Sequence, residues 1–361
     1  MTTMTMPGRA RNSFTAGRLP RGSAWMILAA SWAVFAAVFA MLALSGATDG
    51  FNIVGAVFFG TILFDLTLFG LSFVVEGSRK ARDRLMTSLV ATAFIIALLP
   101  LISLSYTVLE RGLARFDVVY FTESMRNVID SGGGALHAIV GTLEITAMAT
   151  LISVPVGLLA SIYLVEYGRG HLARGITFFV DVMMGIPSIV AGLFTYALFV
   201  MLTGDPGIRS GLMGSVALSV LMIPVVVRSS EEILRLVPNE LREASLALGV
   251  PKWLTVLKIV LPTSLAGLTT GVMLAIARVI GETAPLLIVA GFTASMNYNL
   301  FSDRMMSLPV FVYTQYANQG PDAVAFLDRA WSGALVLIII VMLLNLIARI
   351  VARVFAPKFS R

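Results

Sequence analysis

Long apolar runs separated by short polar segments dominate this chain. A membrane-spanning helix needs about 20 predominantly apolar residues. The sixth run is the shortest, but it too is bounded by charged or glycine-rich segments. The pattern therefore predicts an all-α integral membrane protein with about eight transmembrane helices, at residues 24–45, 51–75, 85–109, 137–165, 174–202, 211–227, 259–280 and 330–350.

The composition supports this prediction and excludes several kinds of site. Of 361 residues, 58% are hydrophobic and only 13% are charged, whereas soluble domains carry about 25% charged residues. The chain has no cysteine and only two histidines, which excludes disulfides and thiolate metal sites and makes a histidine-rich metal site implausible. We therefore expect neither a bound metal nor a bound cofactor.

The basic residues predict an orientation in the membrane. The net charge of +6 is spread over short loops, so we expect contact with membrane lipid and not with nucleic acid. With the N-terminus inside, 19 of the 26 Lys and Arg residues fall in inside segments and six fall outside. Because inside loops carry the excess of positive charge, both termini and the segment 231–262 are predicted to be cytoplasmic.

The first apolar run has an alternative interpretation as a cleavable signal peptide, since small residues follow it at Ser45-Gly46-Ala47. The run is longer than the 7–15 residues of a usual signal-peptide core, and it suits a full span. We therefore predict a cytoplasmic tail over 1–23 and two retained spans within 24–84. A second cytoplasmic tail is predicted over 356–361.

The charged segment Glu231–Pro262 is the longest polar, helix-competent insert between two apolar runs. A helix is predicted over Glu240–Leu248, because Pro238-Asn239 offers a start and Gly249 a stop. It carries a narrow apolar stripe at three- and four-residue spacing, made by Leu241, Ala244, Ala247 and Leu248. Such a helix either packs on its own bundle or lies in a groove of a partner.

The same segment resembles the EAA loop of ABC-importer permeases. Glu243-Ala244-Ser245 is followed after three residues by Gly249 and after nine more by Ile259-Val260-Leu261-Pro262. Ser245 departs from the usual alanine. The resemblance implies a permease subunit whose ATPase partner docks on Glu243, Ala244, Ala247 and Gly249.

Further stretches resemble the permeases of the phosphate-specific importer, of the PstA type, over roughly 85–355. They are Thr142-Leu143 with Pro155-Val156-Gly157, Tyr163–Tyr167, Gly185–Val190, Ala277–Leu287 and Ser307-Leu308-Pro309. The resemblance implies a six-span permease core after two additional N-terminal spans. It also implies a bacterial inner-membrane location and three kinds of partner: a second permease (PstC type), two ATPase subunits (PstB type) that use ATP and Mg, and an extracytoplasmic phosphate-binding protein (PstS type).

Arg278 and Glu282 are the candidate chemical groups of the core, with Thr283 as an additional donor. Four residues apart on a continuous helix, the two charges lie on one face and can pair. The pair either holds helices together or, as the resemblance implies, lines the phosphate path. Arg278 is the only Lys or Arg left within a predicted span, and its planar guanidinium suits an oxyanion.

Four other ionisable residues are assigned structural roles. Asp65 is expected to form a helix–helix hydrogen bond, and Glu144 to be paired or protonated. Asp181 is expected to cap the break at Gly185–Ser188 or to pair with an inside Arg, and His137 to lie at the membrane interface.

The chain is not expected to be an enzyme. It contains no GxxxxGK[ST] phosphate loop. An intramembrane enzyme is disfavoured because His137 and His171 fall at opposite membrane edges, and a secondary transporter because no inverted repeat is visible. The alternative substrates are molybdate, sulfate and phosphonate.

Overall fold

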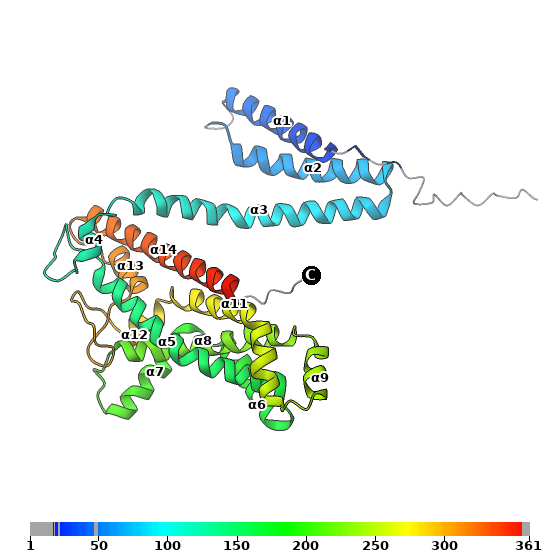
Figure 1. Ribbon diagram of the computed structural model, residues 1–361. Helices are drawn as coiled ribbons and strands as arrows, with labels where there is room; N and C mark the ends of the chain where they lie inside the picture. The colour runs from blue at the N-terminus through cyan, green and yellow to red at the C-terminus, as the bar shows by residue number, and fades with distance from the viewer. Residues whose placement is uncertain (1–16, 18, 21, 47–49, 356–361) are drawn as a thin grey trace, which may run out of the picture. The chain divides into compact units, whose positions relative to one another are not determined.

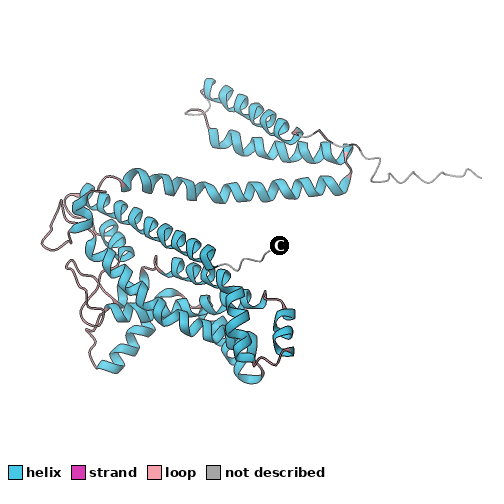
Figure 2. Ribbon diagram, viewed as in Figure 1, coloured by secondary structure: helices cyan, strands magenta, loops and turns pink. Residues whose placement is uncertain are grey.

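The computed structural model describes residues 17, 19–20, 22–46 and 50–355. This part of the chain is helical with connecting loops and contains no strand (Figure 2). The predicted tails lie almost wholly outside the described residues. The helices, labelled in part in Figure 1, are α1 Ser23–Leu44, α2 Ile53–Val75, α3 Ser78–Gly112, α4 Val118–Thr122, α5 Leu136–Ile162, α6 Gly170–Gly185, α7 Ser188–Thr203, α8 Gly211–Arg235, α9 Asn239–Ala247, α10 Lys252–Thr255, α11 Leu261–Val279, α12 Ala284–Val289, α13 Leu308–Ala317 and α14 Ala323–Phe355, with π-helical turns η1 Tyr163–Tyr167 and η2 Val256–Val260.

The predicted all-α membrane architecture is confirmed within the described residues. Seven helices or helix runs are long and apolar enough to cross a membrane, and the pair α6–α7 would make an eighth. The predicted span 174–202 is divided at the predicted break Gly185–Ser188, where α6 and α7 meet at an angle of 111°. The cause is Pro187, which favours an extended conformation at Ile186 and itself precedes the first turn of α7.

The chain divides into two compact units, Met1–Ser105 and Tyr106–Arg361, with the division inside α3. In the first unit α1 packs along α2. Phe35 stacks on Phe59 with 5.7 Å between ring centroids, and Gly60 admits the Trp32 ring, since a Cβ there would lie 2.6 Å from Trp32 Cδ1. Ser88 donates a hydrogen bond from α3 to Asp65 on α2, which confirms the helix–helix role predicted for Asp65.

Glu76 closes the corner between α2 and α3. Its carboxylate accepts a two-pronged contact from Arg84, with Nε–Oε2 and Nη2–Oε1 distances of 2.7 and 3.0 Å. It also accepts from Ser72 Oγ at 2.8 Å and from the Leu19 N–H at 3.1 Å. Burial alone would raise the pKa of Glu76, but these hydrogen bonds outweigh it and lower the pKa to about 2.

The second unit is built around α8, the most buried of the candidate spans. It packs against α5, α11, α7, α6 and α12. Against α5 the approach is close, because Gly157 has no side chain: a Cβ there would lie 2.6 Å from Val226 Cγ1. Ser215 Oγ donates across the seam to the Ile145 carbonyl at 3.1 Å. Small residues and hydroxyl hydrogen bonds of this kind hold helices together where lipid removes the hydrophobic driving force.

The course of α8 gives this unit two distinct ends. The helix begins directly after the loop 204–210 and ends at Arg235, three residues before α9. Its 25 residues span about 37 Å, enough to cross a bilayer. The end that carries α9 is called the α9 end, and the opposite end, with the loops 204–210 and 291–307, is called the distal end (Figure 1).

Arg84→Ala is expected to destabilise the first unit by about 1–3 kcal/mol, because it leaves the buried Glu76 carboxylate without its cation. Arg82→Ala is the matched control, since Arg82 is exposed. The measurement is thermal unfolding of the full chain in detergent. Because the pKa of Glu76 is lowered in the fold, its stabilisation is complete above the ordinary carboxyl pKa of 4.5 and lost as the pH falls toward about 2. Equal stability of the two variants at neutral pH would contradict this assignment.

Candidate functional site

The helix predicted over 240–248 is present as α9, and its ends have the expected causes. It begins after Pro238 and ends before Leu248. Gly249 follows with φ of +78°, a left-handed conformation that costs a residue with a side chain about 1–2 kcal/mol. Gly249 is therefore required by the backbone at the end of α9, whatever it contacts in addition.

One face of α9 packs on the chain and the other is free in the described structure. Ser245 is buried and its hydroxyl lies 2.9 Å from Thr255 Oγ1. The predicted docking residues Glu243, Ala244, Ala247 and Gly249 are all exposed. Apolar side chains extend the same exposed surface, with exposed fractions of 37% to 83% for Leu241, Leu246, Leu248, Leu236 and Trp253. An exposed apolar patch beside polar residues is typical of a protein interaction site.

Arg242 anchors the packed face to two other elements. Its Nε donates to Glu166 Oε1 of η1 at 2.9 Å, and its Nη2 donates to the Leu234 carbonyl of α8 at 2.8 Å. Lys252 adds a hydrogen bond to the Glu166 carbonyl. The side chain of Glu166 is only 6% exposed. Arg242 and Lys252 therefore join α9 and α10 directly to η1 at the end of α5 and to the end of α8.

Sequence reasoning assigned no role to Glu166 or Arg242. The signal available was a lone acid at the end of an apolar run, inside the quoted stretch Tyr163–Tyr167, and a lone base on the predicted docking helix. Nothing in helical spacing relates two positions 76 residues apart. The contact follows only once α5 and α8 are packed together.

Asp181 forms the pair that was predicted as one of its two alternatives. Arg228 of α8 donates from Nε to Asp181 Oδ1 of α6 at 3.1 Å and from Nη1 to Glu231 Oε2 at 2.8 Å. Arg235 completes the cluster on Glu231 at 2.6 Å. The cluster ties α6 to the α9 end of α8.

The structure separates Arg278 from Glu282. Arg278 lies in the last turn of α11, which ends at Val279, whereas Glu282 lies in the following turn. The two residues do not share a continuous helix, because Gly281 and Pro285 both disfavour its continuation and Pro285 lies in the first turn of α12. No ion pair joins Arg278 and Glu282, although both belong to the described residues.

The positive charge of Arg278 is nevertheless accessible in the described structure. Its side chain is exposed, while Glu282 and Thr283 beside it are half-buried. Among the described residues, Arg278 has neither an ion-pair nor a hydrogen-bond partner for its guanidinium. All three predicted path residues thus remain at one helix break, with Arg278 free to meet a ligand.

Arg329 lies in a different environment from the one predicted for it. Arg329, expected outside the membrane, lies in α14 and is fully buried. It donates to Gln315 Oε1 at 2.9 Å and to the carbonyls of Asp130 and Gly132 at 2.7 and 3.2 Å. The Gly-rich segment Ser131–Gly134 and the preceding Asp130 are thus bonded to α14 through backbone carbonyls.

The structure also describes two other residues that were assigned structural roles. His137, the second residue of α5, is 2% exposed and packs edge-on against Phe311 with 5.6 Å between ring centroids; its place at the membrane interface stays a prediction. Glu144 is half-buried, and its Oε2 has no hydrogen-bond partner among the described residues, so of its two predicted alternatives the paired one is not observed for this oxygen. No group of three or more His, Asp or Glu side chains suited to a metal occurs in the described part of the chain.

Comparison with known proteins identifies the family of this chain. Residues 153–361 match the family described as binding-protein-dependent transport system inner membrane component. The chain belongs to that family. It is a multi-pass membrane component of a transport system. The helix α9 lies within the matched residues 153–361, in the polar segment between two apolar spans.

The relatives of this inner membrane component are similar over most of their length. The phosphate transport system permease protein PstA 1 of Mycobacterium tuberculosis (strain ATCC 25618 / H37Rv) is 45% identical over 276 residues, which is 76% of this chain and 88% of that protein. PstA of Pasteurella multocida (strain Pm70) is 38% identical over 284 residues, 78% and 97% of the two chains. In structure, the chain resembles the inward-facing MetNI methionine ABC transporter with a TM-score of 0.50 at 21% identity, covering 62% of this chain and 96% of that one; this likeness concerns the fold alone.

Arg242→Ala is expected to destabilise the α9 end by about 3 kcal/mol, because it leaves the buried Glu166 carboxylate unpaired. Arg169→Ala is the control, since Arg169 is exposed on the same end. The double variant Arg242→Met, Glu166→Leu should recover most of the loss, because no charge is then buried alone. The measurement is thermal unfolding in detergent. Full stability of Arg242→Ala would show that the contact is not structural.

Proposed function

We propose that this chain is the permease subunit of an ATP-driven phosphate importer, forming half of the translocation path and docking an ATPase through α9. The observation that carries the proposal is the free face of α9. Glu243 and Ala244 are exposed on it, while Arg242 on the packed face donates a hydrogen bond to Glu166 of η1. The substrate is proposed from the relatives named as phosphate transport permeases.

The proposed partners follow the same logic. A second permease of PstC type would complete the path, two ATPase subunits of PstB type would bind the α9 end, and a phosphate-binding protein of PstS type would meet the distal end. The chain itself would hydrolyse nothing and bind no cofactor, while ATP and Mg belong to the ATPase. In this arrangement the α9 end and both termini are cytoplasmic, which agrees with the excess of Lys and Arg in those segments.

Coupling in this proposal is mechanical. Closure of the ATPase moves α9, and the Arg242–Glu166 contact passes the displacement to η1 and α8. The neighbouring cluster on Arg228 passes it to α6. The break at residues 280–283, beside Arg278, would then be the place where access changes, since irregular backbone at membrane depth is tolerated where it faces a cavity.

Glu243→Lys is expected to abolish ATPase association without preventing membrane insertion, because it reverses an exposed charge on the docking face. Glu232→Lys is the control, since Glu232 is also exposed at the α9 end but lies on α8. Co-purification of the ATPase with the permease and phosphate uptake are the measurements. Normal co-purification of Glu243→Lys would refute docking through α9.

Arg278→Ala is expected to lower phosphate uptake at least about a hundredfold, because a desolvated oxyanion loses a charge-assisted two-pronged donor. Complex yield should be unchanged, since the exposed Arg278 side chain supports no packing. Arg278→Lys should recover only part of the rate, and Arg349→Ala serves as an exposed control. Uptake with molybdate, sulfate or phosphonate as competitor identifies the substrate. Normal uptake by Arg278→Ala would exclude Arg278 from the path.

A further inference from the structure

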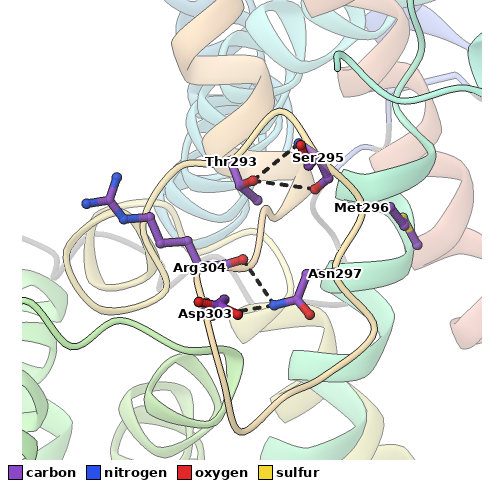
Figure 3. A pocket seen from close by; sticks show the side chains of 6 residues that line it. All are labelled: Thr293, Ser295, Met296, Asn297, Asp303 and Arg304. Atoms are coloured by element: carbon purple, nitrogen blue, oxygen red, sulfur yellow. Dashed lines mark hydrogen bonds between the residues drawn. The ribbon is translucent and has the colours of Figure 1, made fainter. Parts of the chain in front are cut away.

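Two polar cavities lie side by side at the distal end of the second unit. One has a volume of about 420 Å³ and is lined by the loop 293–304. The other, of about 260 Å³, lies between that loop and residues 205–210. Asp303 and Arg304 line both cavities, and the lining around this pair of residues is called the polar rim. Figure 3 shows the side chains that line the first cavity.

The loop that carries Arg304 is held in a defined shape by its own hydrogen bonds. Asn297 Nδ2 donates to the carbonyls of Ser302 and Arg304 at 2.9 and 3.1 Å. The Leu212 N–H at the start of α8 donates to the Leu300 carbonyl at 2.7 Å. The backbone is thereby fixed to α8 before any ligand arrives, and such preorganisation lowers the entropic cost of binding.

The aliphatic parts of the Arg304 and Arg209 side chains lie beside Gly291. This residue has φ of +79°, and a Cβ built on it would lie 3.3 Å from Arg304 Cδ and 3.7 Å from Arg209 Cγ. The Arg209 guanidinium lies over the Tyr196 ring at 4.4 Å and donates from Nη1 to the Ile208 carbonyl at 2.6 Å. A Cβ at position 291 would press on the Arg304 stem and would only touch the Arg209 stem, so both arginines lie beside this glycine.

Both guanidinium groups retain donors that no described residue accepts. Nε and Nη2 of Arg209 form no hydrogen bond within the described part of the chain, and the same holds for the whole Arg304 guanidinium, which extends away from its loop in Figure 3. Planar, two-pronged donors of this kind suit the oxygens of a tetrahedral oxyanion.

Asp303 adds a negatively charged carboxylate to the polar rim. Its φ of +59° is a left-handed conformation that aspartate and asparagine adopt more readily than most residues. Its carboxylate accepts no hydrogen bond from the described residues, and it lines both cavities beside Arg304. A bare carboxylate repels a fully deprotonated oxyanion, but it accepts a hydrogen bond from one that carries a proton. Inorganic phosphate keeps a proton at neutral pH, whereas sulfate keeps none.

We propose that Arg209, Arg304 and Asp303 form a capture site for a protonated oxyanion at the distal end, separate from the Arg278 path. The arginines attract and orient the anion, and Asp303 accepts its proton-bearing oxygen and so rejects sulfate. The substrate class rests on the proposed phosphate transport, and the site deepens it. The distal end is opposite α9, so in that function it is the end at which phosphate arrives.

The test measures phosphate uptake by the complete importer, with its binding protein, in proteoliposomes. Arg304→Gln and Arg209→Gln are each expected to raise the KM for phosphate about tenfold with kcat little changed, because each removes a charge-assisted contact made on arrival. Arg304→Lys should recover part of the loss. Arg126→Gln is the matched control, because Arg126 is an exposed arginine of the distal segment 113–135 and does not line these cavities.

Each result has a separate meaning. An unchanged KM in both glutamine variants would overturn the capture site, while a wild-type importer that carries no phosphate would overturn the proposed function itself. Weaker binding of the phosphate-binding protein to Arg304→Gln, measured by co-sedimentation, would replace the capture site by a protein-docking surface. Yield of the assembled complex checks folding, which we expect to be unaffected since Arg304 is exposed.

Asp303→Asn tests the discrimination step independently. Asparagine also adopts the left-handed backbone at this position, so the loop should keep its shape. With the carboxylate replaced by a neutral amide, sulfate should become a competitor of phosphate binding to the purified permease–ATPase complex without the binding protein. Wild type should show no such competition. Continued exclusion of sulfate by Asp303→Asn would remove Asp303 from the site.

Discussion

The close approach of α5 to α8 is the constraint on which the second unit depends. An apolar side chain gains little free energy when it moves from lipid into a helix interface. Helix association in a membrane therefore relies on tight packing and on hydrogen bonds between polar groups. Gly157 permits that approach, and Ser215 and Ser219 donate to carbonyls of α5 across the seam. The helices α11, α12 and α6 are then arranged around α8.

The seam also fixes where charges meet at its two ends. At the α9 end it brings η1 beside the end of α8, so that Glu166 can receive Arg242. At the distal end it brings the Gly-rich segment beneath α13 and α14, where Arg329 bonds its carbonyls. Arg115 donates to the Gly133 carbonyl and pairs with Asp117, whose pKa is lowered first by the Tyr120 N–H and further by Arg115. The buried Glu166 and Arg329 therefore join elements that are distant in sequence, whereas the Arg115–Asp117 pair is local.

Exposed charge is used differently. Arg278 and Arg304 carry guanidinium groups that the described chain leaves without acceptors, one at a helix break and one on a preorganised rim. The buried Arg329 joins elements of the fold through Gln315 and two backbone carbonyls, whereas Arg278 and Arg304 are exposed. The difference in environment separates this structural arginine from the two that are proposed to bind an anion, although the residue type is the same.

The sequence by itself determined the helical membrane class, nearly all of the spans, and the bounds of α9, because apolar run length, Pro and Gly act locally along the chain. It also located Gly249 at the end of α9, and the resemblance to the EAA loop selected Glu243, Ala244 and Ala247, which the structure exposes. It could not determine that α6 and α7 bend by 111°, that Arg278 and Glu282 are separated by a helix end, or that His137 and Arg329 are buried. Those outcomes depend on which helices pack together, as do the contact of Glu166 with Arg242 and the position of Arg209 and Arg304 on one cavity. Only the tertiary structure decides such contacts, because they join positions with no periodic relation in the sequence.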